Sequence, residues 1–307
     1  MKKDIRSRIY NAQCIGNVEP IEYMTPYPSM RSLMEGQTIK FSDQVIIEKF
    51  KITNLGFFSL VQQTSNWLES IGVKPRQRVI IPKLTNPQSE VLLFGVWNLG
   101  ASAVFSHDLN ITEVKRSCEN VQALKFKTDL FKEIESFPDN FKPKYKPLLS
   151  DEAILTFEKG PGIKLSHYNL LVNINGIQKA IRLKSRTRYH SDLKLGSACW
   201  VIFQVILPFY CGCIKDENKP EMVIGTSDSD YNLRHDLKNI EKFSHNDIGI
   251  CLENTAALCI EKKPIHLSDY EIIENGIQIK GHSVMMGYLD DKINEAAFNN
   301  DNLNILF

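Results

Sequence analysis

The fold is decided by a stretch that reads Asp151-Glu152-Ala153-Ile154-Leu155-Thr156-Phe157-Glu158-Lys159-Gly160-Pro161-Gly162-Ile163-Lys164-Leu165-Ser166-His167-Tyr168-Asn169-Leu170 and continues to Ile181. The apolar run 153–157 predicts a buried strand. Ser166 is a suitable N-cap for a helix with one apolar face, formed by Leu170, Ile174, Ile177 and Ile181. A glycine turn separates strand and helix. Free backbone N–H groups and a helix dipole then point at one place, so the stretch predicts an anion-binding site.

Residues 163–170 resemble the adenylate-forming enzymes, which include acyl-CoA synthetases and acyl-ACP ligases. In that family a loop reading Ser/Thr-Ser-Gly-Thr-Thr-Gly-x-Pro-Lys-Gly precedes a helix that opens Leu-Ser/Thr-His-x-Asn-Leu. The loop here, 158–162, is shorter, contains no Ser or Thr, and has Pro161 in place of the family's lysine. The resemblance implies a degenerate phosphate loop. The residues that it assigns to cofactor binding are Lys159, Gly160, Gly162 and Lys164.

The residues before this stretch fit an α/β fold. Apolar spacing predicts helices at 55–71, 86–100 and 111–120 and strands at 78–81, 101–105 and 123–126. Short strands that alternate with helices of this length indicate βαβ units around a mostly parallel sheet. Residues 127–150, with their prolines and lysines, predict a connection between two subdomains, and no chemistry is assigned to the first 45 residues.

The composition is that of an ordinary globular protein. The chain has 307 residues, 43% hydrophobic and 24% charged, enough to bury a sizeable core. Its 37 Lys and Arg against 36 Asp and Glu give a net charge of +1. A balance of this kind argues against a nucleic-acid partner.

Cysteine spacing and hydropathy indicate where in the cell the protein is located. The seven cysteines include no Cys-x-x-Cys pair, which favours reduced, buried thiols in a cytoplasmic protein. Cys211-Gly212-Cys213 is a weaker alternative, a metal or redox pair. The apolar run 198–213 is interrupted by polar and turn residues and is too short to be transmembrane, so a buried strand and turn is predicted there. Association with a membrane surface or with lipid substrates stays open.

Resemblance to the same family continues beyond the central helix. Residues 207–213 match a Leu-Pro-x-x-x-Gly-Cys turn, and residues 222–226 resemble a strand and Gly-Thr turn that edges the substrate pocket. Counting back from the first turn, Ser197 falls where the family has a pocket histidine, and Trp200 replaces a small glycine and is expected to narrow the acyl channel. The implied substrate-binding residues are Ser197, Trp200, Gly225 and Thr226.

Other family motifs are not recognised. No Tyr-Gly-x-Thr-Glu run occurs, and the segment between Asp236 and Asp247 is short. Residues 276–289 match a late family motif, but the chain stops at Phe307, where relatives continue with Thr-Gly-Asp and a C-terminal domain that carries a catalytic lysine. The resemblance therefore implies the layered α/β N-terminal domain of the adenylate-forming type, with the C-terminal domain absent.

Four segments are expected: an N-terminal extension (1–45), a first α/β subdomain (46–140), a second with the degenerate loop (141–235) and a reduced β-rich subdomain (236–307). By resemblance the protein activates a fatty acid through an acyl-adenylate, with ATP and magnesium if it is active. The missing groups predict inactivity of the chain alone, so no catalytic residue and no metal ligand is assigned, and His167 is expected to cap or pack.

Three alternatives follow from this prediction. The first is a ligase completed by a separate C-terminal domain chain, with a fatty acid or an acyl carrier as partner. The second is a non-catalytic acyl- or nucleotide-binding scaffold. The third is a decayed remnant without activity.

Overall fold

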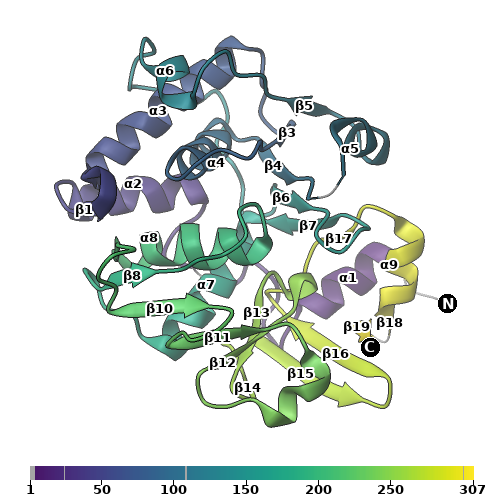
Figure 1. The fold of residues 1–307 in the computed structure, drawn as a ribbon. Coiled ribbons are helices and arrows are strands. Elements are labelled where there is room, and N and C mark those ends of the chain that lie inside the picture. The colour runs from purple at the N-terminus through teal and green to yellow at the C-terminus, as the bar shows by residue number, and fades with distance from the viewer. Residues whose placement is uncertain (1–3, 24, 108, 300) are drawn as a thin grey trace.

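The computed structural model describes residues 4–23, 25–107, 109–299 and 301–307. Three sheets and the helices that cover them form a layered α/β protein (Figure 1). The helices are α1 (Ile5–Gln13), α2 (Met30–Phe41), α3 (Asn54–Ser70), α4 (Gln88–Leu99), α5 (Ile111–Ser117), α6 (Leu130–Ile134), α7 (His167–Ile181), α8 (Leu207–Cys211) and α9 (Asp291–Ala297). Among the described residues, no helix is both long and apolar enough to cross a bilayer.

The first sheet has six strands in the order β17-β7-β6-β4-β3-β5. They are β3 (Arg78–Ile80), β4 (Ser102–Phe105), β5 (Val121–Ala123), β6 (Glu152–Thr156), β7 (Ile163–Ser166) and β17 (Gly287–Tyr288). Strands β3 to β6 pair in parallel, as the alternation of strands and helices predicts, whereas β7 returns antiparallel to β6.

The second sheet has nine strands in the order β14-β13-β12-β11-β10-β8-β9-β1-β2. They are β1 (Val45–Ile47), β2 (Ile52–Thr53), β8 (Arg188–His190), β9 (Ile214–Lys215), β10 (Met222–Gly225), β11 (Tyr231–Arg234), β12 (Asp247–Ile250), β13 (Ala257–Ile260) and β14 (Lys263–Pro264). The third sheet, β15-β16-β19-β18, is antiparallel and consists of β15 (Ser268–Ile273), β16 (Gly276–Gly281), β18 (Phe298–Asn299) and β19 (Asn302–Leu306).

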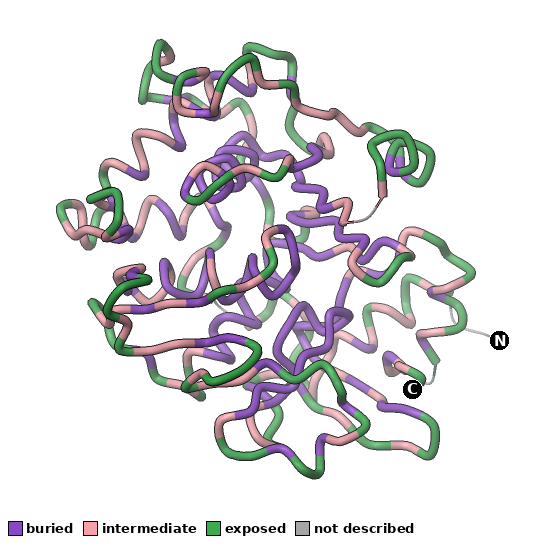
Figure 2. The backbone as a smooth tube through the Cα atoms, in the orientation of Figure 1, coloured by how far each residue is buried: buried purple, intermediate pink, exposed green. Residues whose placement is uncertain are grey.

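The core runs through the middle of the molecule, and exposed residues gather in the outer loops (Figure 2). Helix α4 lies in this core and is buried on every side, which explains why apolar residues occur all around it. The Trp97 indole N–H donates to the Ala153 carbonyl at 2.9 Å and so connects α4 to β6. Gly95 lets α3 approach, since a Cβ there would lie 2.5 Å from Thr64.

The first 45 residues contain two helices and are not merely a turn-rich extension. Helix α1 packs beside the third sheet, where the Arg8 guanidinium donates to the Phe298 carbonyl at 2.7 Å. The Gln13 amide donates to the Val284 and Met285 carbonyls, each at 3.0 Å. These contacts join the two ends of the described chain.

The strand predicted within 198–213 is wrong. This segment forms a π-helix, Trp200–Ile206, that continues into α8. Both ends of the run and its interior are almost wholly buried, and a continuous apolar run does not by itself distinguish a buried strand from a buried helix. The connection 127–150 also contains a helix, α6, and the strand predicted at 123–126 lies earlier, at Val121–Ala123.

The four-segment division stays a prediction. Strands β6 and β7 lie in the same sheet as β3, β4 and β5, so the proposed boundary at 140/141 does not separate two sheets.

Candidate functional site

The glycine turn joins β6 to β7 as a hairpin, in which Thr156 pairs with Ile163. Gly160 and Gly162 have φ angles of +93° and +72°, a region that L residues rarely adopt. A Cβ on Gly162 would lie 2.6 Å from the Leu289 side chain, whereas one on Gly160 would meet nothing within 4 Å. The hairpin tip is therefore tight at Gly162 and open at Gly160.

The predicted contribution of the helix N-terminus to an anion site is wrong, because strand β7 separates the glycine turn from α7. The first N–H groups of α7 are also satisfied. The Ser166 hydroxyl accepts from the Asn169 N–H at 3.1 Å, and the His167 N–H donates to the Asp151 carbonyl at 3.1 Å. Capping of this kind leaves the helix end no free donor for a ligand.

Lys159, at the hairpin, instead faces a buried carboxylate. Its Nζ lies 3.6 Å from Oε2 of Glu253, whose side chain is 6% exposed and belongs to the short 3-10 turn Leu252–Asn254 after β12. The Tyr288 hydroxyl donates to Oε1 of Glu253 at 3.2 Å, and the Cys251 thiol lies 3.4 Å from Oε2. Burial raises the pKa of both Tyr288 and Cys251, so each remains a neutral donor at pH 7.

A second carboxylate, Glu158, lies at the base of the same hairpin. The Ala198 N–H donates to its Oε2 at 3.0 Å, and Nε2 of His107 lies 3.8 Å from the same oxygen. His235 also faces this charge, although burial lowers its pKa and the nearby Lys159 adds to that effect. The site therefore combines two carboxylates, one lysine and two histidines.

The remaining predicted cofactor residue, Lys164, lies elsewhere. It is on β7, half-buried, and the charges around it are those of Glu152, Arg78 and Asp291. Burial lowers its pKa, the Glu152 carboxylate opposes that effect, and the Arg78 guanidinium adds to it. The structure therefore brings Lys159, Gly160 and Gly162 together at one hairpin and places Lys164 among a different set of charges.

The predicted substrate residues divide into two groups. The Ser197 hydroxyl accepts from the Trp200 N–H at 2.9 Å, so it caps the helical residues that begin at Ala198 and continue as the π-helix. Trp200 is fully buried, with its ring edge-on to Phe105 at a centroid distance of 6.1 Å. Gly225 ends strand β10 in a buried position, and Thr226 follows it in an exposed one. The first pair lies at the start of the π-helix, and the second pair lies at the end of a strand of the nine-stranded sheet.

Sequence reasoning missed Glu253. The residue follows the buried strand β12 and is the one charged side chain in the otherwise uncharged run 248–260. A carboxylate inside such a run must find a partner when it is buried, and this is the signal that points to it. The partner of Glu253 could not be predicted from the sequence, because Lys159 lies far from Glu253 along the chain.

The donor set can be tested against ATP and magnesium, the cofactors that the resemblance implies. Magnesium that accompanies ATP is usually held by one or two carboxylates together with phosphate oxygens and water. The test therefore rests on the groups that the hairpin offers to a phosphate. The tip of the hairpin, residues 158–162, has no hydroxyl, and its lysine is already paired with Glu253. The tip of the hairpin therefore offers a triphosphate neither a hydroxyl donor nor an unpaired lysine.

No protein-family profile matches the sequence, and no curated protein matches it. Solved structures do match. The McyG A-PCP, complexed with phenylalanyl-adenylate, is 13% identical with a TM-score of 0.74, over 92% of this chain and 73% of that chain. The long-chain-fatty-acid-CoA ligase FadD1 from Archaeoglobus fulgidus is 12% identical with a TM-score of 0.71, over 96% and 82%.

A third match is to a separately solved domain. The N-terminal domain of FACL13 from Mycobacterium tuberculosis is 14% identical with a TM-score of 0.68, and the match covers 90% of this chain and 95% of that one. Identities this low establish the fold and leave the activity open. The protein has the layered α/β fold of the N-terminal domain of the adenylate-forming enzymes.

Proposed function

We propose that the protein is a non-catalytic acyl- or nucleotide-binding protein built on the adenylate-forming fold. The observation that supports this most is the contact between Lys159 and Glu253 at the shortened hairpin. A phosphate that took Lys159 would leave the carboxylate of Glu253 buried with only the Tyr288 and Cys251 donors. Leaving the buried carboxylate without a cation costs free energy and so disfavours a triphosphate at this site, and solvent reduces that cost because the Lys159 side chain is 46% exposed.

The chemistry of adenylation supports the same conclusion. Transfer of an adenylyl group depends on preorganised donors around the phosphates, and loss of a single donor costs about 3 kcal/mol of barrier. Here the hairpin tip, residues 158–162, has no hydroxyl, and its cation is paired with Glu253. We therefore assign the chain no step of acyl activation when it acts alone, and no catalytic residue.

The ligand class rests on the fold and on the pocket residues. A fatty acid and an acyl carrier are the partners we propose, because relatives of this fold are named as a long-chain-fatty-acid-CoA ligase and an A-PCP. Trp200 fills the interior beside Ser197, which limits the acyl group to one that lies outside this ring. Free thiols at all seven cysteines support our proposal of a cytoplasmic location.

The test combines an activity assay with calorimetry. ATP–pyrophosphate exchange is measured with a panel of fatty acids, with the chain alone and with an added C-terminal domain chain. AMP and the fatty acids are then titrated into the chain, into Lys159→Gln and into Glu253→Gln. We expect no exchange by the chain alone, AMP binding that Lys159→Gln weakens, and tighter AMP binding by Glu253→Gln, which frees the lysine.

Each part of the proposal can fail separately. Pyrophosphate exchange by the purified chain alone overturns the non-catalytic role. Exchange only with the added domain replaces it with a two-chain ligase. No binding of AMP or of any fatty acid, together with no ligand-dependent change in melting temperature, overturns the binding role and favours a decayed remnant.

A further inference from the structure

A cavity of about 340 Å³ lies between α1 and the start of α7. Its walls come from α1, from the turn that contains Pro20 and Ile21, and from the residues at the boundary between β7 and α7. Strand β7 begins at Ile163, next to the glycine turn, and ends at Ser166, which lines the cavity. A strand advances about 3.3 Å per residue, so β7 keeps the cavity roughly 10 Å from the hairpin, and the two are separate sites.

The lining is mainly apolar. The face of α1 that lines the cavity consists of residues about one turn apart, Arg6, Ile9, Tyr10 and Gln13. Tyr168 and Met286 add an aromatic and a thioether side chain from other elements. Tyr10 and Ile21 are still 42% and 45% exposed. A ligand that covered them would remove apolar surface from water, so the cavity favours a ligand with an apolar body.

Ile21 lies at the cavity in a backbone conformation that β-branched residues rarely adopt. Its φ angle is +74°, a value at which glycine is the favoured residue. Strained residues of this kind occur preferentially at ligand sites, where the strain holds a side chain in place. The strain at Ile21 is therefore an observation, separate from the volume, that points to this cavity.

The polar groups that α7 contributes to the lining already have partners. Burial lowers the pKa of His282, so its ring is neutral, and Nε2 faces the Val18 carbonyl at 3.3 Å and carries the proton. Nδ1 of the same ring then accepts from the Tyr168 hydroxyl at 2.6 Å. The Asn169 amide donates to the His282 and Val284 carbonyls at 3.0 and 2.9 Å. Selection of a ligand by charge is therefore left to α1.

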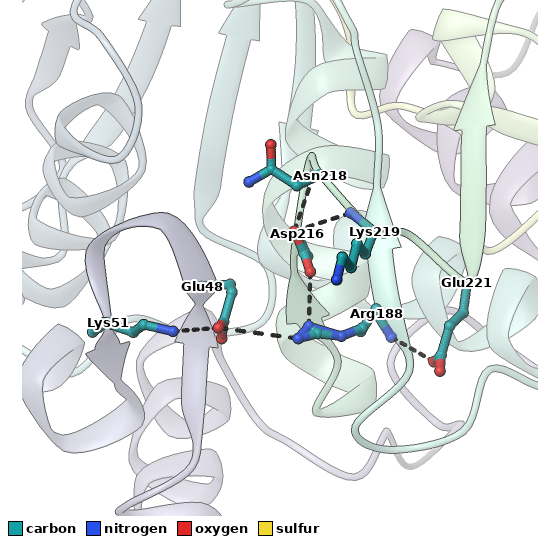
Figure 3. Close-up of polar contacts among 7 residues, drawn as sticks. All are labelled: Glu48, Lys51, Arg188, Asp216, Asn218, Lys219 and Glu221. Atoms are coloured by element: carbon teal, nitrogen blue, oxygen red, sulfur yellow. Dashed lines mark hydrogen bonds and ion pairs between the residues drawn. The ribbon is translucent and has the colours of Figure 1, made fainter.

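Arg6 supplies that charge. It is the one charged residue among the described residues of the lining, and it has no hydrogen-bond or ion-pair partner in the described part of the chain. The Arg188 guanidinium, in contrast, lies 2.8 Å from the Asp216 carboxylate (Figure 3). The Glu19 carboxylate, near the cavity in sequence, accepts the Tyr10 hydroxyl. An unpaired guanidinium beside an apolar cavity favours a carboxylate, which it can bind through two parallel hydrogen bonds.

We propose that this cavity binds a small aromatic carboxylate. The carboxylate bonds to the Arg6 guanidinium, and the rings lie between α1 and Tyr168 and are covered by Ile21. A cavity of about 150 Å³ accommodates a benzene ring, so one of about 340 Å³ suits two fused rings and a short side chain. An aromatic body is favoured because Tyr10, Tyr168 and Met286 can make ring–ring and sulfur–ring contacts with it. This binding goes beyond the function proposed for the hairpin and does not depend on it.

Calorimetry on the full chain tests the charge requirement with 2-naphthylacetate and with 2-naphthylacetamide, which has the same size and no charge. We expect the carboxylate to bind more tightly than the amide, and more weakly as salt is added. Arg6→Gln should weaken the carboxylate about threefold to fivefold, the effect of one ion pair at the protein surface, and leave the amide unchanged. Arg116→Gln is the matched control, because Arg116 is exposed and has no ion-pair partner in the described chain, but lies on α5.

Ile21→Gly separates a role in binding from a role in folding. Glycine adopts a φ angle of +74° without strain, and the substitution removes one wall of the cavity. We expect both ligands to bind about fivefold more weakly, while the midpoint of urea unfolding does not fall. Lys159→Gln should leave the affinity for 2-naphthylacetate unchanged, because the hairpin is a separate site.

Several outcomes overturn the proposal. They are no binding of 2-naphthylacetate, equal affinity for the acid and the amide, and an unchanged affinity in Arg6→Gln or in Ile21→Gly. A loss in Arg116→Gln or Lys159→Gln that equals the loss in Arg6→Gln does so as well, and in Lys159→Gln it places the ligand at the hairpin. Failure of AMP to bind, with binding of 2-naphthylacetate retained, counts only against the function proposed for the hairpin.

Discussion

His167 makes the stability of the protein depend on pH in a way that can be worked out from the structure. It is the first residue of α7, its side chain is 1% exposed, and its ring lies edge-on to Trp97 at 6.4 Å. Nδ1 has no hydrogen-bond partner among the described residues. Burial lowers its pKa from 6.5 to about 4, against a weaker opposite effect of the Asp151 charge.

The sign and size follow from proton linkage. The unfolded chain binds a proton at His167 near pH 6.5, and the folded chain does so only near pH 4. Stability is therefore complete above the higher value and is lost as pH falls toward the lower one. A pKa difference of about 2.5 corresponds to about 3.4 kcal/mol once both states are protonated, of which about 2 kcal/mol is lost between pH 7 and pH 5.

Urea unfolding at pH 7, 6 and 5 measures this loss when the wild-type chain is compared with His167→Phe. The phenyl ring keeps the contact with Trp97 and cannot be protonated, so the variant should lose about 2 kcal/mol less than the wild type between pH 7 and pH 5. His245→Asn is the control, because His245 is exposed. Equal pH dependence in His167→Phe and the wild type would refute the reasoning.

Three further changes should alter stability, each measurable by urea unfolding at pH 7. Ser166→Ala removes the α7 cap and should cost about 1 kcal/mol, whereas Ser166→Asp should retain most of it. Gly162→Ala should cost about 1–3 kcal/mol, because φ is +72° and the new methyl meets Leu289, while Gly160→Ala should cost less since its space is open. Lys215→Met leaves Glu90 buried without its cation and should cost about 3–5 kcal/mol, and adding Glu90→Gln should recover part of the loss; full additivity would contradict the ion pair.

The sequence predicts the local part of the fold well, since local signals suffice for it. The strand at Ala153–Leu155, the N-cap at Ser166 and the helix stop at Gly100 are confirmed, and each depends on a pattern within a few residues. The π-helix Trp200–Ile206 could not be told from a strand, because a segment buried on all sides has no periodicity to report.

The candidate site was harder to predict because it depends on long-range contacts. Lys159 was assigned to phosphate from its place beside a glycine turn, but its partner comes from the 3-10 turn that follows a strand of another sheet. Strand β7 was not predicted after the turn. This short strand lies between the turn and α7, so the helix N-terminus is not part of the site. Position relative to a turn is therefore a weak guide when the next element is unknown.

The short hairpin places Lys159 beside the buried Glu253, so the two charges balance each other. A carboxylate that is 6% exposed requires donors, and the structure supplies Tyr288, Cys251 and Lys159. A hairpin with a longer tip would carry its lysine farther from that carboxylate, and would then need an external anion to balance the cation. With the tight turn fixed by Gly162 against Leu289, the lysine is held at 3.6 Å and the charge is balanced within the chain. The same geometry that stabilises the folded protein therefore removes its need for a phosphate.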